Sequence, residues 1–303
     1  MTRIFGRRDF LRAGGALAGC AVVGRLAAPS CSAAEKTRSS SPSAAAMGWL
    51  VGAQLYTFRR FPFYEALERI AELGIVHVEP CFFLALDKAR PELKTNEDLP
   101  ADARKELKSR LSDRGIVMSA FYSNVGNNRS ADRARRVFEF CKEMGVATIV
   151  AEPPADAFDM LEKLCDEYAI NLAVHNHPES PQSKYWKPEN VLAVCQGRGR
   201  RIGACCDTGH WVRSGLDPVE CLKKMEGRIL GFHLKDALEK GNRKSRDVPL
   251  GQGAGNYAEV LKELRRQGYR GVMTIEYEHD SPELMDDVAK CVAYVEQTAK
   301  SFA

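Results

Sequence analysis

Short apolar segments alternate with amphipathic segments eight times along the chain, from residue 48 to residue 303. The apolar segments have the length of strands, and the amphipathic segments carry apolar residues at helical spacing. Strands that alternate with helices form parallel sheets, in which each helix crosses from one strand to the next. The predicted strands span residues 51–58, 76–80, 117–122, 148–151, 172–175, 202–206, 230–233 and 273–277. The predicted helices include residues 62–73, 101–114, 131–144, 157–168, 218–225, 257–267 and 282–301.

Eight βα units in one stretch of this length predict an α/β fold of the closed (βα)8 type, a TIM barrel. The alternative is a doubly wound open sheet. That fold requires a glycine-rich turn after the first strand to bind a phosphate group, and residues 55–59 read Leu-Tyr-Thr-Phe-Arg instead. The sequence therefore favours the barrel over residues 48–303.

The N-terminal 34 residues differ in composition from the rest of the chain. They contain five arginines and one acidic residue, so their net charge (5 − 1 = +4) equals the +4 of the whole chain. Arg7 and Arg8, followed by Asp9-Phe10-Leu11 and a weakly apolar stretch, are typical of a twin-arginine export signal. We therefore expect an exported protein in the periplasm or at the cell envelope. The remaining chain is close to neutral, which argues against binding to nucleic acid.

Two processing routes remain open for this leader. Leu17-Ala18-Gly19-Cys20 resembles a lipoprotein cleavage site, which would attach a lipid anchor to Cys20, whereas ordinary cleavage would fall near residues 32–34. Residues 35–47 are rich in Ser, Ala and Pro and predict a disordered linker. No later segment carries the 18 or more apolar residues that a transmembrane span needs.

Polar residues gather where the last four predicted strands end, which is where a TIM barrel places its chemistry. Because side chains alternate along a strand, residues two apart share a face. By this rule four successive strands present one residue each at a similar height, and the residue before each on its face is small (Ala173, Cys205, Gly231 and Thr274). The four predicted ligands of one divalent metal ion are His175, Asp207, His233 and Glu276.

Two imidazoles and two carboxylates suit Mn, Co, Zn or Fe better than Mg or Ca. A divalent cation would also compensate the charge of buried carboxylates. The alternative for a single residue at a strand end is a capping role, and Asp207 has the right position to cap a following helix.

The chain resembles the xylose isomerase-like TIM barrel superfamily, and it is similar to exported bacterial proteins labelled sugar phosphate isomerase/epimerase. The resemblance rests on Glu152, His175 and three runs, CDTGHW (206–211), FHLKD (232–236) and TIEYEH (274–279). In related ketose epimerases the metal ligands are Glu, Asp, His and Glu from successive strands. The last three fall on Asp207, His233 and Glu276.

The first ligand position departs from those epimerases, because His175 stands where they have Glu. That Glu and the last one are their paired acid and base, so simple 3-epimerisation is in doubt. Glu152, one strand earlier, can replace the missing carboxylate as ligand or as base. Which of Glu152 and His175 is the fourth ligand stays open.

We expect an isomerase or epimerase that removes a proton next to the carbonyl of a keto-sugar or sugar derivative, forming an enediolate. The alternative is a metal-dependent 3-keto-glycoside lyase or hydrolase, in which a β-substituent leaves. The candidate acid/base groups are Glu152, His177, His210 and Lys235. The candidate substrate-binding residues are Tyr56, Arg59, Glu79, Trp211 and Arg213.

The sequence also bears on other functions and on the state of assembly. An AP endonuclease, which the superfamily includes, would need further metal ligands on the early strands and a basic face. A non-catalytic sugar-binding barrel remains an alternative. A phosphorylated sugar is disfavoured because the chain has no glycine-rich phosphate cradle or arginine cluster. The expected partner is a small sugar, and assembly into a homo-oligomer is left open.

Overall fold

The structure is a computed structural model that describes residues 40–302. The predicted export signal, Cys20 and most of the predicted linker lie outside the described residues. Within them no helix is long and apolar enough to cross a membrane.

The centre of the fold is a parallel sheet with the strand order β3-β2-β1-β11-β8-β7-β6-β5-β4. Its strands are β1 (Trp49–Gln54), β2 (His77–Glu79), β3 (Val117–Met118), β4 (Ala120–Tyr122), β5 (Thr148–Ala151), β6 (Asn171–His175), β7 (Ile202–Asp207), β8 (Ile229–Leu234) and β11 (Gly271–Ile275). The two ends of the order, β3 and β4, are halves of one predicted strand. Ser119 between them donates its amide to Val78 O (3.1 Å) and accepts the amide of Ala147 (3.4 Å). The chain thus joins the two edges, and the predicted TIM barrel is confirmed.

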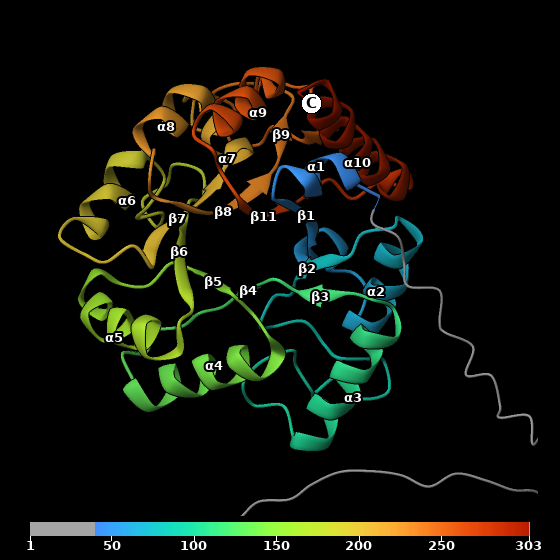
Figure 1. Cartoon of the computed structure of the whole chain (residues 1–303), viewed down its shortest axis with the longest axis vertical. Helices are drawn as coiled ribbons and strands as arrows, with labels where there is room; N and C mark the ends of the chain where they lie inside the picture. Colours follow the sequence, from blue (N-terminus) through green and yellow to red (C-terminus); the bar gives the residue numbers. More distant parts are fainter. Residues whose placement is uncertain (1–39, 303) are drawn as a thin grey trace, which may run out of the picture. The chain divides into compact units, whose positions relative to one another are not determined.

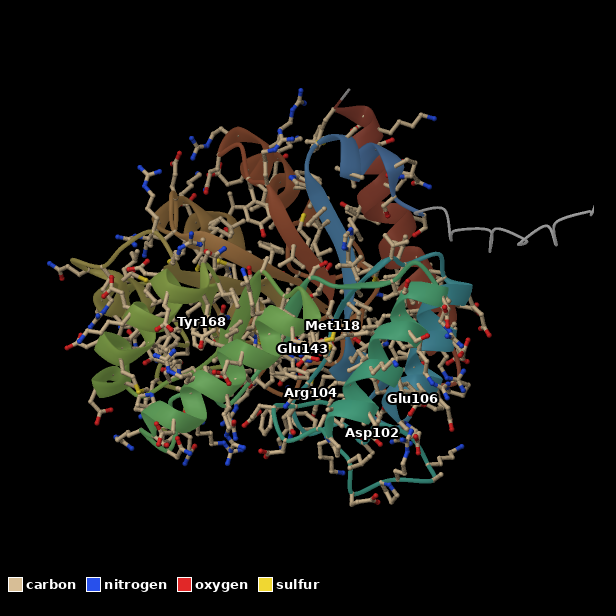
Figure 2. All side chains as sticks on the ribbon, turned by 60° about the horizontal axis from the view of Figure 1, so that its bottom comes forward. Asp102, Arg104, Glu106, Met118, Glu143 and Tyr168 are labelled. Carbon is tan, nitrogen blue, oxygen red and sulfur yellow. The ribbon has the colours of Figure 1, made fainter. Side chains whose placement is uncertain are left out.

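Helices surround this sheet (Figure 1). They are α2 (Phe63–Glu72), α3 (Ala101–Asp113), α4 (Ala131–Met144), α5 (Phe158–Tyr168), α6 (Pro188–Cys195), α7 (Thr208–Arg213), α8 (Pro218–Lys224), α9 (Tyr257–Arg266) and α10 (Leu284–Ser301). Helix α4 illustrates the local signals: the Ser130 side chain accepts the amide of Arg133 at its start, and Gly145 ends it with φ 78°. Neighbouring helices also exchange surface ion pairs, such as Arg104 on α3 with Glu143 on α4 (2.9 Å; Figure 2).

The predicted linker contains a helix, α1 (Pro42–Ala46), so the prediction of disorder over 35–47 is wrong for these residues. The amides of Ser43 and Ala44 donate to the carboxylate of Glu296 on α10, at 2.9 and 3.1 Å. Ala44 is fully buried. This long-range contact explains the order: a carboxylate 252 residues away satisfies the free amides at the start of the helix, and composition alone could not reveal it.

The barrel interior contains small side chains below the ends of the later strands. Ala173 and Cys205 belong to one buried interior cluster, and a Cβ on Gly231 would lie 3.5 Å from Cys205 Sγ and 3.7 Å from Ala173 Cβ. Asp207 is the register partner of His233, which is also the partner of Thr274. The four predicted ligands therefore lie at neighbouring positions above this layer, as the alternation of side chains predicted.

A two-stranded hairpin, β9 (Asp236–Ala237) and β10 (Asp247–Val248), follows β8 and was not predicted. The Asp236 carboxylate accepts the amides of Gly251, Gly253 and Gly255, at 3.0, 3.0 and 2.9 Å. These bonds fix the loop after β10 beside β9. Because they occupy the Asp236 carboxylate, the neighbouring Lys235 pairs with other acids.

Candidate active site

A cavity of about 320 Å³ opens at the C-terminal ends of the strands. One part of its wall is aromatic and comes from the early strands and their loops, with Tyr56, Phe83 and Tyr122. The other part carries imidazoles and charged groups from the later strands: His175, His177, His210, Arg213, Glu276 and Glu278. The two halves of the barrel thus contribute chemically different walls.

The four predicted metal ligands meet beneath this cavity. All four are buried, and each has one side-chain atom that forms no hydrogen bond of regular geometry: His175 Nε2, Asp207 Oδ2, His233 Nδ1 and Glu276 Oε2. Asp207 Oδ2 lies 3.5 Å from His175 Nε2 and 3.7 Å from His233 Nδ1, and His233 Nδ1 lies 2.9 Å from Glu276 Oε2. Buried polar atoms normally have hydrogen-bond partners, so this convergence fits a bound cation, which would share the two carboxylate oxygens with the ammonium of Lys235.

Asp207 both caps a helix and faces this point. Its Oδ1 accepts the amide of His210 (2.9 Å) at the start of α7, while Oδ2 faces the ammonium of Lys235 (3.0 Å) and the imidazoles. The side chain of Asn176, which the sequence reasoning missed, bonds both the amide and the carbonyl of Asp207 (2.8 and 2.9 Å). These bonds fix the end of β7 against the end of β6.

His210 competes with the predicted ligand His233: its ligand atom and those of His175, Asp207 and Glu276 all lie within 4.8 Å of one another, and His233 is not a member of that group. Its Nε2 is 3.6 Å from Asp207 Oδ2. However, Nε2 contacts Lys235 Nζ and Nδ1 contacts Arg213, each at 3.2 Å. Burial holds the pKa of His210 well below its usual value, so its imidazole is neutral. The partners of His233 are instead the carboxylates of Glu79 and Glu276, at 2.9 Å each, so a cation would be attracted to His233 more strongly than to His210, which lies between two cationic side chains.

Lys235 is fully buried among acids. Its ammonium lies 3.0 Å from Asp207 Oδ2, 2.9 Å from Glu276 Oε2 and 3.1 Å from Glu278 Oε1. Burial alone would raise the pKa of the two glutamates, but Lys235, together with His233 at Glu276 and Arg213 at Glu278, outweighs burial and lowers both pKa values to about 2. Lys235 therefore compensates the acids of the site and does not pair with Asp236.

Glu152 lies at the end of β5 beside two histidines. Its Oε1 is 2.7 Å from His177 Nδ1, 3.4 Å from His175 Nδ1 and 3.2 Å from the Tyr122 hydroxyl. Burial raises the pKa of Glu152, but the hydrogen bonds from the two imidazoles outweigh it, and the net shift is far below the usual value. Glu152, His175 and His177 form a second group close enough to hold a cation, and it shares His175 with the first.

Arg213 is buried and paired. It contacts Glu278 Oε2 (2.6 Å) and Asp247 Oδ1 (2.5 Å), and it lines the cavity. Four carboxylates with lowered pKa (Glu152, Asp207, Glu276 and Glu278) thus face two permanent cations, Lys235 and Arg213. Asp247 and Glu79 are two further acids, beside Arg213 and His233. Acids thus outnumber the permanent cations of the site, and a divalent ion would compensate part of the excess.

Three predicted substrate-binding residues lie off the cavity wall. Trp211 is buried in the hydrophobic core, because α7 turns that face inward. Arg59 lies at the rim, where it pairs with Asp280 (2.6 Å). Glu79 is buried below the cavity and contacts His233. For these residues the prediction of substrate contact is not supported, whereas Tyr56 and Arg213 do line the cavity.

Several wall residues were missed by the sequence reasoning, among them Cys81, Phe83, Tyr122 and Glu278. Tyr122 and Glu278 follow the same alternation rule as the ligands, two residues after Ala120 and Glu276, so a signal for them existed. Phe83 lies in a loop after β2, where strand parity says nothing, and its ring packs edge-on against Tyr56 (centroids 6.2 Å apart).

Partial similarity links the chain to two bacterial proteins. It is 29% identical to the rhizopine catabolism protein MocC of Rhizobium meliloti over 136 residues, which is 40% of this chain and 41% of that protein. It is 36% identical to an inosose dehydratase of Clostridium botulinum (strain Eklund 17B / Type B) over 140 residues, covering 42% and 46%. The chain thus spans less than half the length of either relative.

A solved structure has the same fold. It is a xylose isomerase-like TIM barrel protein from Mycobacterium smegmatis in complex with magnesium, with a TM-score of 0.67 and 17% identity, covering 84% of this chain and 97% of that one. The family model described as "Xylose isomerase-like TIM barrel" matches residues 67–295, which include all four predicted ligands. The chain belongs to the xylose isomerase-like TIM barrel family.

Proposed function

We propose that this protein is a metal-dependent enzyme that removes a proton next to the carbonyl of an uncharged keto-sugar. The observation that carries the proposal is the convergence of four buried ligand atoms, on His175, Asp207, His233 and Glu276, that form no hydrogen bonds of regular geometry. A divalent cation there would supply Lewis-acid stabilisation of negative charge on the oxygen beside the reacting carbon. Two imidazoles among the ligands favour Mn, Co, Zn or Fe over Mg.

His177 is the best candidate for the base. It lines the cavity, its side chain is 40% exposed, and its Nδ1 lies 2.7 Å from the carboxylate of Glu152. If Nδ1–H donates to Glu152, then Nε2 holds a lone pair that can accept a proton from a substrate. Glu152 thus orients the base and stabilises the charge that forms on it.

His210 and Lys235 have different roles in this proposal. The neutral His210 lines the cavity and is held between Lys235 and Arg213, so it suits hydrogen bonding to a substrate hydroxyl. The ammonium of Lys235 stabilises the carboxylates around it and, through Glu278, the charged wall of the cavity.

The walls favour an uncharged substrate. The cation that lines the cavity, Arg213, is already paired with Glu278 and Asp247. A phosphate group would meet mainly carboxylates, whereas Tyr56, Phe83 and Tyr122 offer aromatic surface for the apolar face of a sugar ring. We therefore infer a neutral keto-sugar or keto-glycoside.

The fate of the proton decides between two reactions. Return of the proton gives an isomer or epimer, whereas loss of a β-substituent gives elimination. Elimination by a 3-keto-glycoside lyase is the second candidate, because His175 replaces the paired Glu of ketose epimerases and because one relative is named a dehydratase.

Incubation of the metal-loaded enzyme with a 3-keto-disaccharide in D2O, followed by NMR, tests the proposal. We expect deuterium at the carbon next to the carbonyl; release of a monosaccharide with an unsaturated sugar would identify the lyase. Neither exchange nor cleavage on neutral keto-sugars would contradict the proposal.

We further propose that residues 1–34 direct export by the twin-arginine route. The support is the Arg7-Arg8 pair and the near-neutral charge of the rest of the chain. Fractionation of cells that express the wild type and the double variant Arg7→Lys/Arg8→Lys tests export. Acyl labelling of Cys20→Ala beside the wild type tests the lipid anchor, and a cytoplasmic wild-type protein would contradict both ideas.

A further inference from the structure

Glu79 is a carboxylate that the proposed chemistry does not use. It ends β2, across the barrel from most of the predicted ligands, and only 1% of it is exposed. Both oxygens have partners: Oε1 lies 2.9 Å from His233 Nε2, and Oε2 accepts the hydroxyl of Thr274 (3.0 Å). A buried carboxylate without an arginine or lysine partner is costly to maintain, so its position calls for a functional reason.

The contact with His233 defines which imidazole nitrogen carries a proton. An ionised carboxylate can only accept, so His233 Nε2 must donate its hydrogen to Glu79 Oε1. Nδ1 is then the nitrogen that would hold a cation. That atom lies 2.9 Å from Glu276 Oε2 and 3.7 Å from Asp207 Oδ2.

We propose that Glu79 is a positioning residue: it holds His233 with Nε2 protonated and Nδ1 turned toward the cation site. This rests on the proposed metal site and deepens it. The carboxylate fixes the ring by its bond, and Thr274 fixes the carboxylate in turn. Its negative charge also increases the basicity of Nδ1 as a ligand.

His175 provides an internal comparison. Its Nε2 faces the site, and its Nδ1 lies 3.4 Å from Glu152 Oε1, an oxygen that also contacts His177 and Tyr122. Glu79 Oε1 has a shorter contact, and both partners there are buried. We therefore expect Glu79 to contribute more to metal affinity than Glu152 does.

Three variants separate the effect of the charge of Glu79 from that of its hydrogen bond. Glu79→Gln keeps an acceptor for His233 and loses the charge, whereas Glu79→Ala loses both. The matched control is Glu97→Gln, at a buried acid that pairs with Arg133 away from the site.

Calorimetric titration of the metal-free proteins with Zn²⁺ gives the Kd of each variant. We expect about 10- to 100-fold weaker binding for Glu79→Gln, a larger loss for Glu79→Ala, and no change for Glu97→Gln. Thermal unfolding of each variant reports folding separately.

A second readout follows the tautomer itself. In ¹⁵N–¹H NMR of histidine-labelled, zinc-loaded protein, we expect a slowly exchanging Nε2–H for His233 in the wild type and in Glu79→Gln, and its loss in Glu79→Ala. An unchanged Kd in folded Glu79→Gln, or a His233 proton on Nδ1, would overturn the positioning role. A wild type that binds no metal would instead contradict the proposed function, and the presence or loss of the slowly exchanging His233 Nε2–H in the metal-free wild type and Glu79→Ala would then decide whether Glu79 positions the ring.

Discussion

The ammonium of Lys235 lies 3.0 Å from Asp207 Oδ2, and both side chains are fully buried. The two residues come from the runs CDTGHW and FHLKD, which are distant in sequence and adjacent in the barrel. Gly209 makes this possible, because a Cβ at that position would overlap the Lys235 side chain at Cγ and Cδ. The two runs therefore form one packed unit, in which Gly209 leaves room for the stem of Lys235 on its way to the acids.

Substitution Gly209→Ala tests that packing. The added methyl group must displace the Lys235 stem, so we expect a destabilisation of about 1–3 kcal/mol in urea unfolding together with a loss of activity. Gly199→Ala is the control, since its Cβ would meet only Glu162 Oε1 at 3.5 Å. Equal stability of the two variants would contradict the packing role of Gly209.

Substitution Lys235→Met removes the buried cation and leaves three carboxylates near one another. We expect the metal-free variant to lose about 3–5 kcal/mol of unfolding free energy. A bound divalent ion would compensate part of that charge, so we expect excess Mn²⁺ or Zn²⁺ to raise the Tm of Lys235→Met more than that of the wild type. Differential scanning calorimetry with and without a chelator measures both; an equal response to metal would argue against a shared cation site.

Substitution His177→Gln removes the proposed base. We expect kcat to fall by about 10²–10⁴-fold, because no other group on that side of the cavity accepts the proton as readily. The Kd for Zn²⁺ should stay close to that of the wild type, since His177 is not a predicted ligand. His279→Gln, in the loop between β11 and α10 and off the cavity wall, is the control and should retain activity. Full turnover by His177→Gln on the same keto-sugar would rule the base out.

The contact between α1 and Glu296 predicts a pH dependence of stability. Burial alone would raise the pKa of Glu296, but its hydrogen bonds with Ser43 and Ala44 outweigh it and lower the pKa. A lowered folded pKa means that the stabilisation is present above the unfolded pKa of about 4.3. It is lost as the pH falls through the folded pKa.

Glu296→Gln should therefore be less stable than the wild type at pH 7, by about 1 kcal/mol as for other helix N-terminal caps. The difference should shrink and disappear as the pH falls through the lowered folded pKa of Glu296. Urea unfolding of both proteins across this range measures it, and a difference that persists in acid would contradict the assigned sign.

The sequence predicted the parts of this molecule that depend on local pattern. The alternation of side chains brought His175, Asp207, His233 and Glu276 to one height, because parity survives wherever a strand is regular. The alternation could not reveal that the Glu79 carboxylate contacts His233 Nε2, since the two residues are 154 positions apart. Trp211 was misjudged because α7, six residues long, rotates it into the core. The prediction of the aromatic wall was incomplete because Phe83 lies on a loop, where the alternation of side chains gives no signal. The helix α1 was missed because it depends on the distant contact with Glu296.

The most direct test of the metal site is anomalous diffraction from a crystal soaked in Mn²⁺ or Zn²⁺. We expect one peak at about 2.0–2.2 Å from His175 Nε2, Asp207 Oδ2, His233 Nδ1 and Glu276 Oε2. A structure with no peak among these four atoms, or with the ion held by Glu152 and His177 instead, would contradict the proposed centre.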